Sequence, residues 1–273
     1  MSTELCLLKL GGSLITDKNK AGTPRMEIIH RLAVEIAAAC AQNPSLRLIV
    51  GNGAGSFGHV PAKRYGTRQG VHTPEEWRGF AEVWRQAAAL NRLVTDALYA
   101  AGLPAMAFPP SAAVTAREGQ VVSWDLSPIQ YALQAGLLPV VQGDVIFDTA
   151  RGGTILSTED LFEHLARKLR PGRILLAGLE QGVWADFPAC TRLVAEITPE
   201  NLPEVAPALG GSVGTDVTGG MASKVGQSLR LVEEIAGLEV LIFSGEIAGV
   251  VKDALLGARV GTLLRGSAYE QAI

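Results

Sequence analysis

The chain has 273 residues, of which 48% are hydrophobic and 19% are charged. This length fits one large domain or two small ones, and the apolar fraction is too high for a disordered chain. Twenty-four basic and 27 acidic residues leave a formal charge of −3, so no basic surface for a nucleic-acid backbone is predicted. The longest apolar runs are strand-sized, so we expect no membrane-spanning helix.

The N-terminal segment and the cysteines indicate a cytoplasmic protein. Residues 1–10 contain an acid, Glu4, but no basic segment and no cleavage motif, so no secretory signal is predicted. The cysteines are odd in number and too far apart for a zinc or redox pair: Cys6, Cys40 and Cys190. We therefore expect a soluble protein of a reducing cytoplasm, and the sequence assigns no metal-ligating residues.

Strand-like and helix-like segments alternate along the chain. Short apolar runs predict strands at Leu5–Leu10, Leu46–Val50, Ala105–Phe108, Leu138–Val141, Arg173–Leu176, Val240–Phe243 and Val260–Leu264. Helical spacing or a capping signal predicts helices at Glu27–Ala41, Thr73–Ala101, Ser157–Lys168, Gly220–Ala236 and Gly249–Leu256. The Pro and Gly content predicts surface loops at Asp17–Pro24, Gly66–Pro74 and Asp186–Gly214. Strands separated by helices pair in parallel through right-handed crossovers, which predicts an α/β sandwich.

Glycine-rich turns follow several of the predicted strands. They are Gly11-Gly12-Ser13, Gly51–Gly58, Gly143-Asp144 and, after a longer loop, Gly219-Gly220. Ligands of open α/β sheets lie at the carboxyl ends of the strands, where the amides of such turns and the N-termini of helices attract anions. Any one of these glycine pairs is equally compatible with a tight turn that binds nothing. Their recurrence at equivalent strand ends favours an anion site.

Three lysines accompany these turns. Lys9 interrupts an apolar strand, and a buried ammonium is costly unless it reaches an anion at the end of that strand. Lys18 lies in the next loop, and Lys224 lies about one turn inside the helix that begins at Gly220. Taken singly, Lys18 and Lys224 fit solvated surface lysines better than ligands, whereas Lys9 does not.

The run Gly53–Gly58 satisfies the G-x-G-x-x-G pattern of dinucleotide-binding proteins, but it fits poorly. It follows the second strand, Pro61 interrupts the helix that should begin at once, and no acid ends a following strand. An NAD(P) oxidoreductase is an alternative that depends on this run alone. His59 follows the run directly and is a candidate to hydrogen-bond a phosphate or carboxylate.

Taken together, these segments resemble the isopentenyl phosphate kinases of the amino acid kinase superfamily. The matching stretches run in family order: Lys9–Lys18, Gly53–His59, Gly143-Asp144, Ser157–Leu161, and Asp216–Met221 with Lys224. The Gly-Ser-Phe-Gly-His run at residues 55–59 is the most specific to this branch. Relatives commonly carry Asp-x-Asp-Gly-Val where this chain has residues 178–184, so no nucleotide contact is assigned near Leu179.

The resemblance implies ATP-dependent phosphorylation of isopentenyl phosphate to isopentenyl diphosphate, with Mg²⁺. It also implies a three-layer αβα sandwich with a mainly parallel central sheet, and usually a homodimer. Within one domain, about residues 1–170 would bind the acceptor and about residues 171–273 the nucleotide. A related kinase for a phosphonate antibiotic such as fosfomycin and a non-catalytic nucleotide-binding protein of the same fold are alternatives.

The resemblance also implies roles for individual residues. ATP would contact Lys9, Leu10, Gly11, Gly12, Ser13, Gly55, Gly220 and Lys224. The acceptor would contact Ala54, Gly55, His59 and Thr158, and Lys18 would stabilise the transition state. Asp144 is a candidate to orient the lysines, or equally a structural turn residue. A helical stripe is a candidate wall for the five-carbon tail, or simply core: Phe80, Val83, Trp84 and Ala87.

Overall fold

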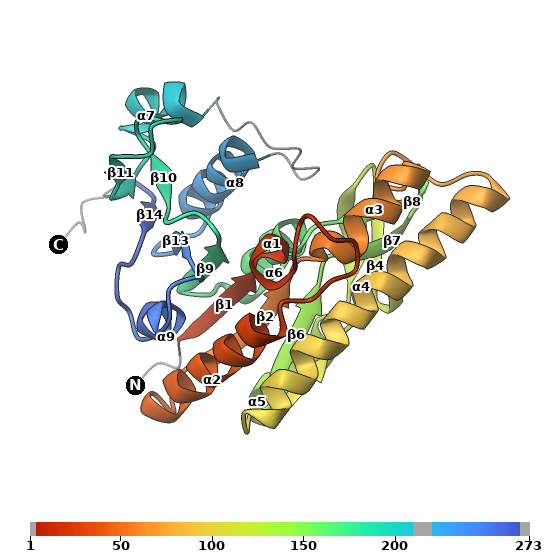
Figure 1. Ribbon diagram of the computed structural model, residues 1–273, viewed down its shortest axis with the longest axis horizontal. Helices are drawn as coiled ribbons and strands as arrows, with labels where there is room; N and C mark the ends of the chain where they lie inside the picture. Colours follow the sequence, from red (N-terminus) through yellow and green to blue (C-terminus); the bar gives the residue numbers. More distant parts are fainter. Residues whose placement is uncertain (1–3, 210–219, 268–273) are drawn as a thin grey trace.

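The computed structural model describes residues 4–209 and 220–267. Among these residues, eight strands form a central sheet in the order β12-β14-β13-β9-β1-β2-β6-β3. Neighbouring strands are parallel, except that β13 and β14 are antiparallel. Helices cover both faces of this sheet (Figure 1). The predicted three-layer αβα sandwich with a mainly parallel central sheet is therefore confirmed.

The strands of the central sheet include every strand expected from the sequence, with ends within two residues of those expected. They are β1 (Leu5–Leu10), β2 (Arg47–Asn52), β3 (Ala105–Ala107), β6 (Leu138–Gln142), β9 (Arg173–Gly178), β12 (Glu196–Ile197), β13 (Glu239–Ser244) and β14 (Thr262–Arg265). Successive side chains of a strand point to opposite faces of the sheet. In β1, Leu8 and Leu10 pack in one core cluster and Leu7 packs in the other.

The face toward which Leu8 and Leu10 point is covered mainly by two long helices and one short one. These are α2 (Met26–Gln42), α4 (Pro74–Ala100) and α9 (Val250–Leu255). Figure 1 shows α2 and α4 lying side by side along the sheet. The predicted start of α4 is confirmed, because Thr73 and Glu76 form a reciprocal capping box around Pro74.

The opposite face, toward which Leu7 points, carries α5 (Ser127–Gln134), α6 (Thr158–Leu169), α7 (Leu202–Leu209) and α8 (Gly220–Glu234). Ser157 caps α6 as predicted, in a capping box with Asp160. Because side chains alternate along β1, Lys9 faces the same side as Leu7 and therefore the first turn of α6. This orientation determines which acidic side chain can form an ion pair with Lys9.

A second sheet, in the order β5-β4-β7-β8, was not predicted from the sequence. Its strands are β4 (Val114–Arg117), β5 (Gln120–Trp124), β7 (Asp144–Asp148) and β8 (Gly152–Leu156), and the short η1 helix (Pro110–Ala112) precedes them. Figure 1 shows this sheet beside α3 and the first half of α4. Val145 of β7 packs against Phe80 of α4 and Val71, so the second sheet extends the core beyond the end of the central strands.

Two sequence expectations were wrong. The helix α3 (Gly55–Tyr65) begins directly in the glycine-rich run and continues through Pro61, which was expected to interrupt it. The missing N–H of Pro61 removes only one hydrogen bond of the helix, and its ring is buried. The expected loop at 186–214 contains strands β11 (Leu193–Val194) and β12 as well as α7, whose residues Val205 and Leu209 are buried. Tertiary packing of α7 outweighs its proline content.

The order of the central strands separates the two parts of the chain. Strands that follow residue 170 lie on one side of β1, and β2, β6 and β3 lie on the other. The central sheet is continuous across this division. That residues before and after about 170 bind the acceptor and the nucleotide stays a prediction. Within the described ranges, no helix is both long and apolar enough to span a membrane.

Candidate functional site

A cavity of about 1070 Å³ opens at the carboxyl ends of the central strands. Gly11 follows β1, Gly53 follows β2 by sequence, Gly143 follows β6 and Gly178 ends β9, and all four line the cavity. Small-molecule sites typically occupy roughly 300–1,000 Å³. This cavity therefore lies at the upper end of that range, and it opens at the edge where open α/β sheets bind ligands.

Three helices begin at the wall of the cavity. The first residues of α3, α6 and α8, which are Gly55, Thr158 and Gly220, all line it. The unpaired N–H groups and the dipole of a helix give its N-terminus a partial positive charge. Three such ends around one cavity favour a ligand with several negative charges.

The first two glycine turns touch backbone to backbone. A Cβ atom placed on Gly12 would lie 2.6 Å from the Cα of Gly55, and one placed on Gly53 would lie 2.8 Å from the nitrogen of Gly12. Any side chain at these positions would force the two turns apart. The glycines thus bring the end of β1 and the start of α3 as close together as two backbones allow.

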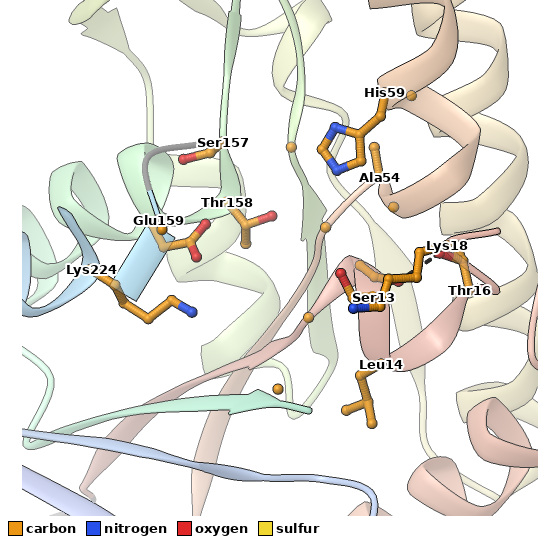
Figure 2. A pocket seen from close by; sticks show the side chains of 18 of the residues that line it. Ser13, Leu14, Thr16, Lys18, Ala54, His59, Ser157, Thr158, Glu159 and Lys224 are labelled. Carbon is orange, nitrogen blue, oxygen red and sulfur yellow. Dashed lines mark hydrogen bonds between the residues drawn. The ribbon is translucent and has the colours of Figure 1, made fainter. Parts of the chain in front are cut away.

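The three lysines of the sequence analysis all line this cavity. Lys9 comes from β1, Lys18 from the loop before α2, and Lys224 from the second turn of α8. Figure 2 shows Lys18 and Lys224 entering from opposite sides and pointing toward the space between them. The structure therefore brings together the cations that the sequence grouped by motif, while their catalytic roles stay predictions.

Lys9 forms an ion pair with Glu159, in the first turn of α6. The two side chains are only 13% and 15% exposed, and Oε2 of Glu159 is buried without a hydrogen-bond partner among the described residues. Burial favours a raised pKa for Glu159, but the charges of Lys9 and Lys224 outweigh it and hold that pKa below its ordinary value. The anion that compensates Lys9 is thus supplied by the protein itself.

Asp144 was a candidate to orient the lysines or, equally, a structural turn residue, and its contacts fit the second interpretation. Its carboxylate accepts hydrogen bonds from the backbone N–H groups of Ser111, at 3.2 Å, and Val145, at 2.9 Å. Burial raises the pKa of Asp144 to about 6, although these hydrogen bonds oppose the rise. Asp144 lines the cavity, yet its contacts hold η1 against the start of β7, and Glu159 is the acid that contacts a lysine.

Glu159 lies within the matching stretch Ser157–Leu161, but nothing in the sequence assigned it a role. A buried lysine on β1 predicts that some acid lies nearby, but not which acid. Only the packing of α6 against β1 selects Glu159, and that packing depends on Gly51. A Cβ there would lie 2.8 Å from the ring of Phe162, so a larger residue would move α6 away.

The residues expected at the acceptor also lie at the cavity. Ala54, His59 and Thr158 line it, and Figure 2 shows the ring of His59 pointing into it from α3. The hydroxyl of Thr158 donates to the carbonyl of Asn52 at 2.8 Å, which fixes the start of α6 to the end of β2.

Most of the residues expected at ATP line the same cavity: Lys9, Gly11, Gly12, Ser13, Gly55, Gly220 and Lys224. Leu10 is the exception, because its side chain is buried in the core and does not line the cavity. Residues 216–219 of the last matching stretch lie outside the described residues.

The candidate tail stripe on α4 divides into two parts. Val83 and Ala87 line the cavity, together with Ile155 of β8. Phe80 instead packs edge-on against Trp77, and Trp84 is 45% exposed. Half of the stripe is therefore core or surface, and the apolar wall is shared between α4 and the second sheet.

Near the start of α8 the cavity has an aromatic wall that the sequence analysis did not assign. Trp184 and Phe187 line it together with Leu179 and Met221. The indole N–H of Trp184 lies 3.4 Å from a carboxylate oxygen of Glu180. Leu179 and Trp184 lie in the stretch that departs from the family pattern, and Phe187 follows it closely, so no motif pointed to them.

Comparison with known proteins agrees with this geometry. The model of the amino acid kinase family matches residues 4–244. The chain belongs to this family. It is 36% identical to an isopentenyl phosphate kinase from Methanothermobacter thermautotrophicus, over 96% of this chain and 99% of that protein. It is 32% identical to one from Methanocaldococcus jannaschii, over 94% of this chain and 97% of that protein.

A solved structure extends the likeness to three dimensions. A crystal structure of an isopentenyl phosphate kinase superposes with a TM-score of 0.77 at 31% identity, covering 95% of this chain and 99% of that one. A carbamate kinase from Giardia lamblia shares the fold at 14% identity, with a TM-score of 0.69. As a member of the amino acid kinase family, the chain is a kinase, and the match gives no support to an oxidoreductase.

Glu159→Gln should destabilise the folded protein by about 3 kcal/mol at neutral pH, because it leaves the ammonium of Lys9 buried without its counter-charge. Urea unfolding measures this difference. Glu234→Gln is the matched control, since its pair with Arg167 is 45% and 40% exposed and should contribute less than about 1 kcal/mol. Equal effects of the two substitutions would contradict a buried ion pair at Lys9.

Asp144→Asn should alter how stability depends on pH. The pKa of Asp144 rises from 3.8 to about 6 on folding, so the folded state binds this proton more tightly than the unfolded state does. Stability from that proton is complete below pH 4 and is lost as the pH rises through about 6, a change of about 3 kcal/mol. The variant, which cannot ionise there, should therefore gain stability relative to the wild type between pH 4 and pH 7.5.

Urea unfolding at several pH values measures that difference. Asp96→Asn, which removes a 53% exposed carboxylate from α4, is the control. A difference between Asp144→Asn and the wild type that stays constant from pH 4 to pH 7.5 would contradict the raised pKa.

Proposed function

We propose that this protein transfers the γ-phosphoryl group of ATP to isopentenyl phosphate and so forms isopentenyl diphosphate, a step of isoprenoid biosynthesis. One observation carries the proposal: three lysines, three helix N-termini and His59 surround a single cavity that also has an apolar wall. The relatives and the structural neighbour named above are isopentenyl phosphate kinases, which supports this acceptor over other phosphate or carboxylate acceptors.

The acceptor in this reaction is itself a phosphate monoester, largely dianionic at neutral pH because its second pKa is near 6. Its oxygen is already a nucleophile, so no general base is needed. The barrier comes from repulsion between the two anions, since unit charges 4 Å apart repel by about 4 kcal/mol at an effective dielectric constant of 20. Catalysis then consists of positioning and of neutralising charge.

The residues around the cavity divide this work according to position. Lys9 and Lys224, which lie near Glu159, would hold the phosphates of ATP over the turn at Gly11–Ser13. His59 and the amides at the start of α3 would hold the acceptor phosphate. Lys18, which enters from the opposite side to Lys224, would follow the phosphoryl group as it moves.

The two ends of the cavity suit the remaining parts of the substrates. The apolar wall of Val83, Ala87 and Ile155 would take the five-carbon tail, and the aromatic wall of Trp184 and Phe187 would lie beside the nucleoside. The two walls lie on opposite sides of β1. The helix α4 packs against β6 and β3, beyond β2, whereas Trp184 follows β9 on the other side. The part of the chain before residue 170 would thus bind the acceptor and the part after it the nucleoside, with the triphosphate between them at Gly11–Ser13.

We propose Mg²⁺ as the ion that accompanies ATP. The described residues contain no group of three or more His, Cys, Asp or Glu side chains able to hold a metal. They do offer the buried oxygen Oε2 of Glu159, which has no hydrogen-bond partner, as a ligand directly or through water. Phosphate oxygens would supply most other ligands, and the bound ion would neutralise charge on the phosphates.

We also propose a homodimer and a cytoplasmic location. Among residues 4–209 and 220–267, no strand pairs with the outer side of the edge strand β3, and Met106 there is 50% exposed, which suits contact with a second copy. All three cysteines are free thiols, as expected in a reducing compartment. Sedimentation of the purified protein would decide the oligomeric state.

The direct test is ATP consumption by the purified protein with Mg²⁺ and isopentenyl phosphate. We expect turnover with isopentenyl phosphate and formation of the diphosphate, with little turnover of fosfomycin. Faster phosphorylation of fosfomycin would replace the proposed acceptor. Binding of ATP with no turnover of either compound would instead indicate a non-catalytic nucleotide-binding protein.

Lys18→Ala should lower kcat by about 10²–10³-fold, because it removes a positive charge that acts on the phosphoryl group in transfer. The KM for ATP should change little, since the donor phosphates keep Lys9 and Lys224. Lys20→Ala is the control, because Lys20 lies in the same loop but does not line the cavity. A kcat unchanged by Lys18→Ala would remove the role assigned to this lysine.

His59→Ala should raise the KM for isopentenyl phosphate by about tenfold, the loss expected for one hydrogen bond to a charged group. The KM for ATP should stay near that of the wild type. Steady-state kinetics with each substrate varied in turn measure both constants, and His30→Ala, on α2 and not lining the cavity, is the control. The reverse pattern, with only the KM for ATP raised, would refute the assignment.

A further inference from the structure

The turn after β1 and the start of α3 share a buried hydroxyl group, that of Thr16. Its Oγ1 donates a hydrogen bond to the carbonyl of Gly12 at 2.8 Å and accepts one from the backbone N–H of Ser56 at 3.0 Å. Thr16 is 1% exposed, so neither bond competes with water. One side chain thus links the turn proposed to bind ATP with the turn proposed to bind the acceptor.

The bond to Gly12 alone would be unremarkable, because threonine often bonds the carbonyl four residues earlier. The bond from Ser56 is different in kind, since it joins segments 40 residues apart. Ser56 is the second residue of α3, where backbone N–H groups have no partner inside the helix. Thr16 supplies that partner at the point where Gly12 and Gly55 approach most closely.

The same threonine sits at the base of the loop that carries Lys18. It forms an isolated β-bridge with Pro24, and Asp17 donates to the carbonyl of Thr23 at 3.0 Å, which closes the loop. Gly22 then donates to the carbonyl of Ser56 at 3.2 Å. The loop is therefore attached to α3 through both backbone groups of Ser56, one of them through Thr16.

We propose that Thr16 is a positioning residue that fixes three parts of the site relative to one another: the donor turn, the acceptor turn and the Lys18 loop. The proposal rests on the proposed function. Each phosphate has its own ligands, so each substrate would still bind without Thr16. Transfer also requires the two phosphates to meet in line, and an error of about 1 Å in such alignment costs roughly a hundredfold in rate.

The test compares Thr16→Val, which keeps the shape but loses the hydroxyl, with Thr16→Ser, which keeps the hydroxyl. We expect Thr16→Val to lower kcat by roughly ten- to a hundredfold, because the buried N–H of Ser56 loses its acceptor and the turns shift. The dissociation constants of ATP and isopentenyl phosphate, each measured alone, should change by less than about threefold. Thr16→Ser should recover most of the rate.

The matched control is Thr23→Val, which removes an exposed hydroxyl of the same loop that lies 3.3 Å from the carbonyl of Ala21. It should leave kcat unchanged. A wild-type kcat in Thr16→Val, an equal loss in Thr16→Ser, or a loss confined to the binding of one substrate would overturn the proposal. Absence of turnover in the wild type would instead refute the proposed function.

Hydrogen exchange at the amide of Ser56 adds a readout that needs no turnover. The amide should be protected in the wild type and in Thr16→Ser, and should exchange faster in Thr16→Val while the amides of the β1 strand stay protected. If Thr16→Val does not fold, exchange of the Ser56 amide can still be measured in the wild type and in Thr16→Ser. Fast exchange of this amide in the wild type would overturn the proposal.

Discussion

In the proposed reaction, repulsion between two phosphate groups is the constraint on which the site depends. Lysines alone would overcome this repulsion poorly, because several ammonium groups around one cavity would also repel one another. Glu159 lies among them, pairs with Lys9 and is held ionised by Lys9 and Lys224 together. Its negative charge offsets part of the repulsion among the lysines, while the three lysines still outnumber it and leave positive charge for the phosphates.

The fold produces this arrangement from ordinary features of a parallel sheet. Alternation along β1 turns Lys9 toward α6, and the small residue Gly51 lets α6 approach closely enough for Glu159 to reach it. Because the strands are parallel, their glycine turns and the helices that follow gather at one edge. Backbone contact between Gly12 and Gly55, reinforced by Thr16, sets the distance between the turn after β1 and the start of α3.

Much of this could be predicted because the signals were local. Apolar runs placed the central strands, and capping boxes at Thr73 and Ser157 placed two helices. Glu159 could not be predicted, since its role depends on how α6 packs against β1. The second sheet was not predicted because its strands lack a continuous apolar run: β5 is largely exposed and β8 begins with two glycines. The helix α7 was not predicted because tertiary contacts, more than its own sequence, stabilise it. Trp184 could not be predicted as part of the cavity, because it belongs to no recognised motif.

A crystal structure with a non-hydrolysable ATP analogue and isopentenyl phosphate tests the central claim most directly. The account predicts the triphosphate between the turn at Gly11–Ser13 and the start of α8, within reach of Lys9 and Lys224. It predicts the acceptor phosphate against His59 and the first amides of α3, with Lys18 between the two. Phosphates bound away from this edge of the sheet, or an acceptor phosphate with no contact to His59 or α3, would contradict it.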